Sequence, residues 1–393
     1  MSASAGLYVH LPWCTRKCPY CDFNSYEARS GIPEELYVDV LLADLGVELA
    51  RSGPLVLSSI FFGGGTPSLF GGPAIERLLS GIARQARFAA DIEITLEANP
   101  GSAESARFSA YRAAGVNRLS LGIQSFNDER LNALGRVHQA SEAYAAIEFA
   151  RRAGFDNFNL DLMFGLPGAQ VGDALDDLQA AIDAAPTHLS WYQLTLEQGT
   201  AFARNPPQLP SHDQICDDYD AGLELLAAAG FEQYEISAYA RSGRKARHNL
   251  NYWQFGDYLG IGAGAHGKIN VAGKIYRRAK IRHPERYMKS VLAGEPTVVE
   301  ERIHAARVVS EFMLNALRLK EGFSLGDFSR TTGVPVGAPV VAAPLARAVQ
   351  LNWLETHGDR VTPTANGFRF LNDLQLLFID DGESQSTDSA GVI

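Results

Sequence analysis

The sequence predicts an α/β protein, a partial (β/α)6 barrel open on one side, followed by a smaller C-terminal domain that is helical and winged-helix-like. Three observations support this fold class. Short β-branched or aromatic runs alternate with segments of helical period as far as residue 229. Polar, charged and glycine residues gather where the predicted strands end, and the pattern changes near Pro296. A doubly wound parallel sheet would give the same alternation, so it stays an alternative.

The first part of the chain repeats one strand, one turn and one helix. Gly115, Gly154 and Gly230 stand where helices commonly end in a left-handed residue. The expected strands are Gly6–His10, Leu57–Phe62, Ile92–Glu97, Arg118–Ile123, Phe158–Met163 and His188–Thr195. The expected helices are Glu35–Ala50, Ala74–Ala86, Ala103–Ala113, Ser141–Ala153, Ala174–Ala184 and Asp213–Ala229.

The C-terminal part has a different pattern. Helices are expected at Ala305–Leu317 and Leu325–Thr331, then a β-hairpin wing turning at Gly358, then a helix from Asn366 to Ile379. We expect residues 1–295 to form the core domain, 296–379 the second domain and 380–393 a disordered tail. The acidic balance favours a structural or docking role for the second domain over DNA binding.

Bulk properties restrict the classes of function. The net charge of −10 argues against nucleic acid as a partner, and no apolar run reaches the roughly 18 residues of a transmembrane helix. The first residues do not resemble a signal peptide, so we expect a cytoplasmic protein. Three of the four cysteines crowd into eight positions, which in a reducing compartment indicates metal chemistry. The fourth, Cys216, is expected to be a small buried residue.

The cysteine cluster has the spacing C-x3-C-x2-C, formed by Cys14, Cys18 and Cys21. Thiolates hold iron–sulfur clusters, and three thiolates leave one iron of a [4Fe–4S] cluster open to a small ligand. The alternative is a zinc site with His10 as the fourth ligand. It is less favoured, because structural zinc sites usually bring two ligand pairs together in a small fold.

These residues resemble the radical S-adenosylmethionine (SAM) superfamily, and Phe61–Ser68 resembles its glycine-rich segment. The chain is also similar to the oxygen-independent coproporphyrinogen III oxidase-like family. That likeness rests on Glu97–Pro100, Leu121–Phe126, Leu134–His138 and Asn159–Gly168, and it covers nearly the whole chain. The resemblance implies a radical SAM fold with a [4Fe–4S] cluster that holds SAM on its open iron.

The resemblance also implies which residues meet SAM. Tyr20 would pack on adenine, while Gly64, Gly65 and Thr66 would present backbone groups to the methionyl end. The other expected SAM residues are Tyr8 beside the cluster, Glu97 toward the cationic cofactor, Arg136 toward the carboxylate, and Gln124 and Asp161 as hydrogen-bonding groups.

Two branches of this family compete. The heme chaperone branch (HemW) is favoured because Phe23 stands where the oxidase pattern has a further cysteine, and because Cys14 lies almost at the start. His248, Asn249, Tyr252 and Trp253 also match the HNxxYW motif of that branch. His248 is the expected axial ligand, with His10 or His266 as alternatives, and the basic run Arg244–Arg247 could meet heme propionates.

The sequence therefore predicts a protein that binds a [4Fe–4S] cluster, SAM and heme and delivers heme to client hemoproteins. An electron donor for the cluster and a homodimer are further expectations, and no catalytic residue is assigned. The first alternative is the coproporphyrinogen III oxidase, which uses a 5′-deoxyadenosyl radical. The second is a radical SAM enzyme with another substrate.

Overall fold

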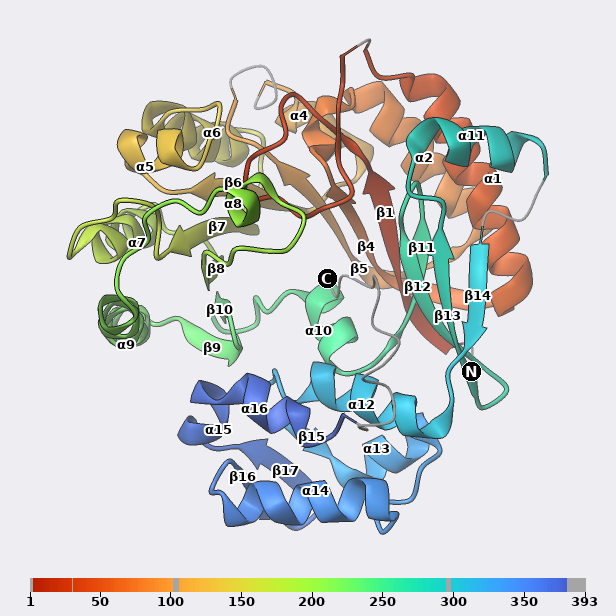
Figure 1. Ribbon diagram of the computed structural model, residues 1–393. Coiled ribbons are helices and arrows are strands. Elements are labelled where there is room, and N and C mark those ends of the chain that lie inside the picture. The colour runs from red at the N-terminus through yellow and green to blue at the C-terminus, as the bar shows by residue number, and fades with distance from the viewer. Residues whose placement is uncertain (1–2, 30, 102–105, 295–297, 380–393) are drawn as a thin grey trace.

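The computed structural model describes residues 3–29, 31–101, 106–294 and 298–379, and its centre is one large twisted sheet (Figure 1). The six expected strands lie side by side and run parallel. They are β1 (Ala3–Leu11), β4 (Leu55–Gly64), β5 (Arg87–Ala98), β6 (Arg118–Gln124), β7 (Phe158–Phe164) and β8 (His188–Gln193). The predicted order of parallel strands is confirmed.

Helices cover the outer face of these strands because each has an apolar stripe. In α2, Ile75, Leu78, Leu79 and Ile82 recur at helical spacing and are buried. The helices are α1 (Glu34–Ser52), α2 (Gly72–Gln85), α4 (Phe108–Ala114), α5 (Asp128–Ala133), α6 (Ala140–Arg152), α7 (Asp173–Asp183), α8 (Ala201–Arg204) and α9 (His212–Ala228). Part of the helix expected at Ala103–Ala113 lies outside the described residues.

The sheet has twelve strands and is wider than the sequence predicted. On one side, β11 (Asp257–Ile261) pairs in parallel with β1, and antiparallel strands follow: β12 (His266–Val271), β13 (Lys274–Lys280) and β14 (Val298–Arg302). On the other side, β10 (Ala238–Ala240) and β9 (Glu232–Glu235) continue from β8. The sheet reaches Arg302 and so passes the expected domain boundary at residue 296.

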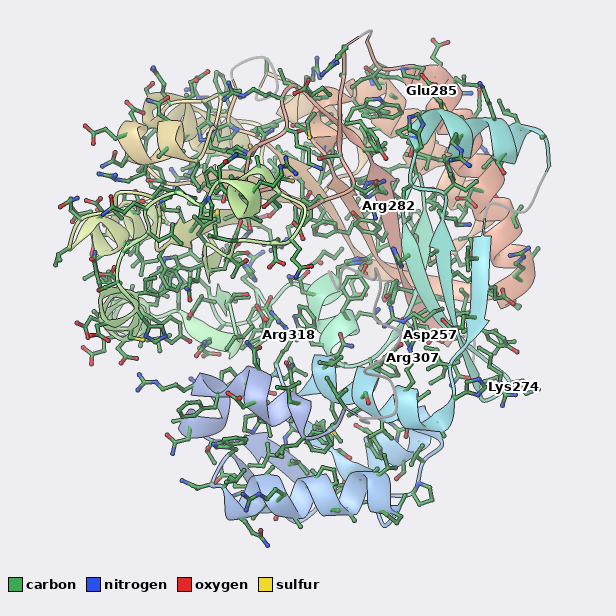
Figure 2. All side chains as sticks on the ribbon, in the orientation of Figure 1. Asp257, Lys274, Arg282, Glu285, Arg307 and Arg318 are labelled. Atoms are coloured by element: carbon green, nitrogen blue, oxygen red, sulfur yellow. The ribbon has the colours of Figure 1, made fainter. Side chains whose placement is uncertain are left out.

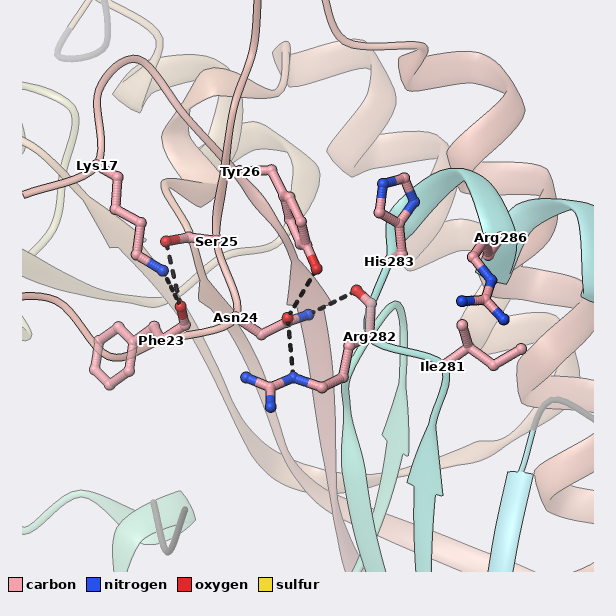
Figure 3. A pocket seen from close by; sticks show the side chains of 9 residues that line it. All are labelled: Lys17, Phe23, Asn24, Ser25, Tyr26, Ile281, Arg282, His283 and Arg286. Atoms are coloured by element: carbon pink, nitrogen blue, oxygen red, sulfur yellow. Dashed lines mark hydrogen bonds between the residues drawn. The ribbon is translucent and has the colours of Figure 1, made fainter. Parts of the chain in front are cut away.

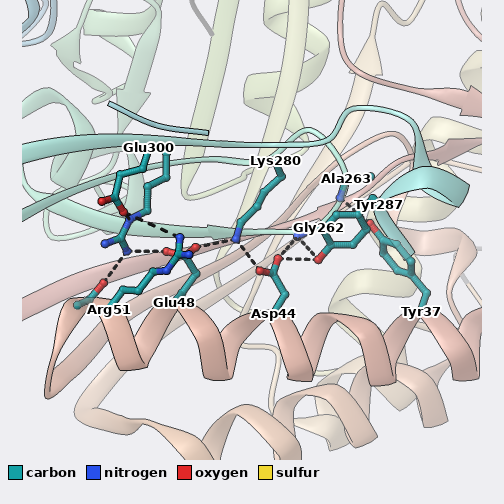
Figure 4. A network of polar contacts seen from close by, with 11 residues as sticks. Tyr37, Asp44, Glu48, Arg51, Gly262, Ala263, Lys280, Tyr287 and Glu300 are labelled. Atoms are coloured by element: carbon teal, nitrogen blue, oxygen red, sulfur yellow. Dashed lines mark hydrogen bonds and ion pairs between the residues drawn. The ribbon is translucent and has the colours of Figure 1, made fainter. Parts of the chain in front are cut away.

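A buried charge network fastens the added strands to α1 (Figure 4). Lys280 on β13 donates to Asp44 at 2.5 Å and to Glu48 at 2.6 Å, and each of these side chains is at most 2% exposed. Arg278 donates to Glu48 at 2.8 Å from the same face of β13. Tyr287, on α11 (Pro284–Leu292), donates to Asp44 at 2.6 Å. Each buried carboxylate thus has a cation or hydroxyl partner, and these partners offset the cost of removing its charge from water.

The C-terminal part has its own core around Phe312, whose ring makes edge contacts with Phe255, Phe323 and Phe328. Its elements are α12 (Ala305–Ala316), β15 (Phe323–Ser324), α13 (Leu325–Thr332), α14 (Pro339–Gln350), β16 (Leu354–His357), β17 (Arg360–Pro363), α15 (Ala365–Arg369) and α16 (Leu371–Leu376). The expected hairpin is confirmed by β16 and β17.

Two expectations for single elements are wrong. The final helix is two short ones, because the backbone at Phe370 (φ −106°, ψ 37°) leaves the helical region while its ring stacks on Trp353. Cys216 is partly exposed, because it lies beside the buried stripe of α9, which runs through Ile215 and Asp218. The expected tail, 380–393, lies outside the described residues.

Candidate radical SAM site

The three clustered cysteines lie on one loop that follows β1. Cys14 ends the short strand β2 (Trp13–Cys14), which pairs with β3 (Tyr26–Glu27) and closes the loop at its base. Within the loop, the Cys21 N–H donates to the Cys18 carbonyl at 3.1 Å. All three thiols are free, and burial raises the pKa of Cys14 and of Cys21. This shift favours the neutral thiol at Cys14 and Cys21, and a bound metal would favour their thiolates.

The structure argues against His10 as a ligand of zinc or of heme iron. Its Nδ1 lies 2.9 Å from the Tyr8 hydroxyl and its Nε2 lies 2.9 Å from the Asn24 carbonyl oxygen, so both ring nitrogens have partners. Within the described ranges, no three His, Cys, Asp or Glu side chains surround a position for one ion. A [4Fe–4S] cluster makes a different demand, because its thiolates bind separate irons of a larger group.

The glycine-rich segment packs directly on the cysteine loop. A Cβ on Gly65 would lie 2.5 Å from the Trp13 carbonyl oxygen, and one on Gly64 would lie 2.5 Å from the His10 ring. Gly64 also has a φ of 116°, which L side chains rarely adopt. The Thr66 N–H donates to the Trp13 carbonyl at 2.7 Å. Glycine is therefore required here for the two loops to approach.

Two carboxyl groups, Glu97 at the end of β5 and Asp161 on β7, lie close enough for their charges to interact. Burial, and next the charge of Asp161, raise the pKa of Glu97 to about 8, and burial raises the pKa of Asp161. Their hydrogen-bond donors include the Gly64 N–H for Glu97 at 3.3 Å and the Ser120 hydroxyl for Asp161 at 3.0 Å, both uncharged. Two adjacent acids held by neutral donors favour a cationic ligand.

Arg136 lies in the connection after α5, beside the cysteine loop. Its Nη2 donates to Asn99 Oδ1 at 2.7 Å and to the Gly122 carbonyl at 2.6 Å, and its Nη1 lies 3.9 Å from the Cys18 sulfur. Its Nε is buried and has no partner among the residues that the structure describes. An anionic group would satisfy this donor, so the two acids and Arg136 suit a ligand that carries both a cationic and an anionic group.

The remaining expected SAM residues, Tyr8, Tyr20 and Gln124, lie near Glu97 or Arg136. Tyr20 packs against Phe202, with ring centroids 6.4 Å apart. Gln124 has a φ of 69°, and its Oε1 accepts from the Tyr192 hydroxyl at 3.0 Å. The Tyr8 hydroxyl lies 2.9 Å from Nδ1 of His10. The structure thus brings the expected residues of β1, β4, β5, β6 and β7 together at the carboxyl ends of the strands.

Two residues of this site were not among the expected SAM residues. Asn99 donates through Nδ2 to Thr66 Oγ1 at 3.1 Å and accepts from Arg136, so it links the glycine-rich segment to the arginine. Its place two residues after Glu97 is a signal that could have identified it. Tyr192 on β8 holds Gln124, and a tyrosine within a strand gives no comparable signal.

The HNxxYW motif lies elsewhere, on α10 (Arg247–Trp253), near the amino ends of the strands and beside the C-terminal domain (Figure 1). His248 is 1% exposed: its Nδ1 lies 2.8 Å from the Ser59 hydroxyl and its Nε2 2.9 Å from the Tyr252 hydroxyl. Burial lowers its pKa to about 3. His248 is thus a neutral ring whose nitrogens both have partners, and it is not open to a metal in this conformation.

The rest of the motif is partly buried. Trp253 lines a cavity of about 390 Å³ between α10 and the C-terminal domain, with Arg318 4.3 Å above its ring. In the basic run, Arg244 pairs with Asp156, Lys245 with Glu321 and Arg247 with Asp91, so its cations already have carboxylate partners. Asn249 is partly exposed. His266, the other alternative heme ligand, begins β12 and is exposed.

Comparisons with known proteins agree with the geometry. The radical SAM superfamily domain matches residues 8–181, and the HemN C-terminal domain matches residues 303–370. The chain is 47% identical to the heme chaperone HemW of Haemophilus influenzae over 380 residues, covering 95% of this chain and 98% of that protein. It is 46% identical to the heme chaperone HemW of Escherichia coli over 374 residues, covering 95% and 97%.

One solved structure is similar over most of the fold. The coproporphyrinogen III oxidase HemN of Escherichia coli superposes with a TM-score of 0.81, at 22% identity, over 96% of this chain and 90% of that chain. At this identity the likeness concerns the fold alone. In the part of the chain that the structure describes, no helix has the length and apolar character to cross a membrane.

Proposed function

Because the chain belongs to the radical SAM superfamily and, within it, to the family of the HemW heme chaperones, we propose that it binds heme and passes it to client hemoproteins. The observation that carries this proposal is the match to two proteins of that name over nearly their whole lengths. An oxidase shares the fold along both parts of the chain at 22% identity, so the proposal rests on the much higher identity to the two chaperones.

The proposal includes a [4Fe–4S] cluster on Cys14, Cys18 and Cys21, with SAM on its open iron. The free thiols on one loop and the unpartnered Arg136 Nε support this. When bound, such a cluster supplies one electron to the SAM sulfonium. The chain's own residues bind and orient: Glu97 and Asp161 face the cationic part, and Arg136 faces the methionyl carboxylate.

The other SAM residues have supporting roles in this proposal. Gly64, Gly65 and Thr66 keep the backbone close to the cysteine loop, and Tyr20 offers its ring to adenine. Tyr8 and Gln124 would offer a hydroxyl and an amide group to the polar atoms of SAM. Assignment of Asn99 to this set follows from its bonds to Thr66 and Arg136.

The heme residues expected from the sequence, His248, Asn249, Tyr252 and Trp253, stay a prediction. Axial ligation by His248 would require its bonds to Ser59 and Tyr252 to break. A reducing compartment such as the cytoplasm, an electron donor for the cluster and a homodimer also belong to the proposal. The free thiols support the first of these.

Two anaerobic measurements on reconstituted protein test the function. In the first, heme is titrated and followed by absorption spectroscopy, and saturation near one heme per chain is expected. In the second, coproporphyrinogen III is supplied with SAM and a reductant, and no protoporphyrinogen is expected. Clear turnover in the second assay would replace the chaperone with the oxidase.

A further inference from the structure

A pocket of about 380 Å³ opens between the cysteine loop and the start of α11 (Figure 3). The residues that line it are Lys17, Phe23, Asn24, Ser25, Tyr26, Ile281, Arg282, His283 and Arg286. Three of these are Lys or Arg, and the lining, as the described residues define it, contains no Asp or Glu. The pocket thus differs from the run Arg244–Arg247, where each cation has a carboxylate partner.

Asn24 builds the pocket by joining its two walls. Its Nδ2 donates to the carbonyls of Arg282 and Ala263, each at 2.9 Å, and its Oδ1 accepts from the Tyr26 hydroxyl at 3.3 Å. A Cβ on Gly264 would lie 2.3 Å from Asn24 Nδ2, so the fit between the walls is close. Asn24 therefore fixes the backbone of the two walls, while the side chains of Lys17, Arg282 and Arg286 are exposed to solvent and Lys17 Nζ donates to the Phe23 carbonyl at 2.8 Å.

The cations lie on two sides of Asn24. Figure 3 shows the Arg282 guanidinium extending toward the side of Phe23 and Lys17, while Arg286 and His283 lie on the other side. Arg282 makes one long bond, from Nε to Asn24 Oδ1 at 3.4 Å, and its other nitrogens face outward. The helix α11 begins beside them at Pro284, with Glu285 in its first turn.

An exposed aromatic ring adjoins these charges. Phe23 is 54% exposed, whereas most large apolar side chains of this domain are buried. A flat apolar surface beside a set of cations suits an amphipathic ligand with a planar ring and carboxylate groups. A small inorganic anion would use the cations but not the ring.

Resting on the proposed function, we propose that this pocket receives the propionate carboxylates of heme through Arg282, Arg286 and Lys17, with the porphyrin edge against Phe23. The site lies at the carboxyl ends of the strands, beside the cysteine loop and far from Arg318 at the C-terminal junction (Figure 2). It places heme at the opposite end of the sheet from α10, where His248 is closed off.

The test compares heme with heme dimethyl ester, which keeps the ring and lacks the carboxylate charges. Both are titrated into reconstituted wild-type protein, the double variant Arg282→Gln/Arg286→Gln, the variant Lys17→Gln, and the control Arg84→Gln on an exposed part of α2. Thermal unfolding and iron content establish that each variant folds and holds its cluster. We expect the double variant and the ester each to bind about tenfold or more weakly, and the two losses not to add.

Each outcome decides the proposal. Lys17→Gln should weaken heme binding less than the double variant does, and Phe23→Ser should weaken heme and ester alike. If the double variant binds heme as the wild type does, the pocket assignment falls while the heme chaperone function stands. If the wild type binds no heme, both fall. If inorganic pyrophosphate competes with heme as well as free propionate-bearing porphyrin does, the pocket is a general anion site and the proposal is overturned.

Discussion

At the scale of single residues, the ionisation of Glu97 sets the charge of the candidate SAM site. Its pKa of about 8 lies well above the usual value of 4.5, because burial and the neighbouring Asp161 oppose ionisation. A SAM sulfonium carries a permanent positive charge and favours the ionised carboxylate. Affinity for SAM should therefore rise about tenfold between pH 6 and pH 8, measured by anaerobic equilibrium binding. Glu97→Gln should bind SAM weakly and without this pH dependence.

The same raised pKa has a consequence for the stability of the cofactor-free protein. The unfolded chain loses this proton near pH 4.5 and the folded chain near pH 8, so the free energy of unfolding falls across that window. Glu97→Gln should remove the loss and stabilise the cofactor-free protein at pH 8 by about 2 kcal/mol, allowing for partial solvent access. Denaturant unfolding at pH 5 and pH 8 measures it, and an equal effect at both pH values would contradict the assignment.

The cysteines provide a second prediction for single residues. Cys14→Ala, Cys18→Ala or Cys21→Ala should each abolish the iron–sulfur absorption of the reconstituted protein, because a [4Fe–4S] cluster with two protein thiolates is poorly held. Cys216→Ala is the matched control, since this partly exposed thiol lies on α9 beside His212. Iron and sulfide analysis measures the result. Full cluster content in any of the first three variants would contradict the ligand set.

At the scale of elements, the charges inside β13 explain both a stability feature and a limit of prediction. Lys280→Met should lower the free energy of unfolding by about 3 kcal/mol or more, because it leaves Asp44 and Glu48 buried with too few cations. Lys274→Met, at the exposed start of the same strand, should change it by less than about 0.5 kcal/mol. Equal effects of the two changes in urea unfolding would show that the network adds nothing.

The strands that the sequence predicted are rich in large apolar residues and carry few charges, such as β4 and β7. The missed strands β12 and β13 carry Lys268, Arg278 and Lys280 at buried positions, which a hydrophobic pattern cannot identify. The charges of Arg278 and Lys280 are tolerated because α1, over two hundred residues earlier in the sequence, supplies Asp44 and Glu48. Lys268 pairs instead with Asp257 on β11. The strands β9 and β10 are too short to give a pattern.

For the candidate site, too, only some of the residues could be proposed from the sequence. Cys14 and Glu97 could be proposed because each stands at or near a strand end in a recognisable motif, and Asp161 because it lies in such a motif within β7. The environment of His248 could not be predicted, because Ser59, the partner of its Nδ1, lies on β4, far away in the sequence. The pocket around Arg282 was missed for the same reason, since Asn24 and Arg282 meet only in three dimensions.

At the scale of the whole molecule, a chain of aromatic rings connects the cofactor end of the barrel with α10. Tyr8 stacks on Phe61, Phe61 on His248, and His248 meets Tyr252, with centroid distances of 6.3, 5.1 and 4.8 Å. The motif that the sequence singled out for heme thus fills the amino end of the barrel. Phe255, just after α10, packs on Phe312 of α12 and so connects the first part of the chain to the C-terminal part.

The junction gives a prediction for the whole molecule. Phe312→Ala should lower the free energy of unfolding by about 3 to 5 kcal/mol, because the ring contacts Phe255, Phe323 and Phe328 and leaves a cavity among them. It should also make the connection near residue 303 more sensitive to protease. Phe149→Ala, on the surface of α6, is the control. Unchanged proteolysis together with unchanged stability would mean that the two parts do not depend on each other.

The central claim, that the protein hands heme to other proteins, is tested most directly by the kinetics of heme transfer. Heme-loaded protein is mixed anaerobically with increasing concentrations of an apo-b-type cytochrome, and the spectrum of the reconstituted cytochrome is followed. Direct delivery predicts a transfer rate that rises with acceptor concentration, because the two proteins must meet. A rate that stays constant and equals the dissociation rate of heme into a passive scavenger would contradict the chaperone account.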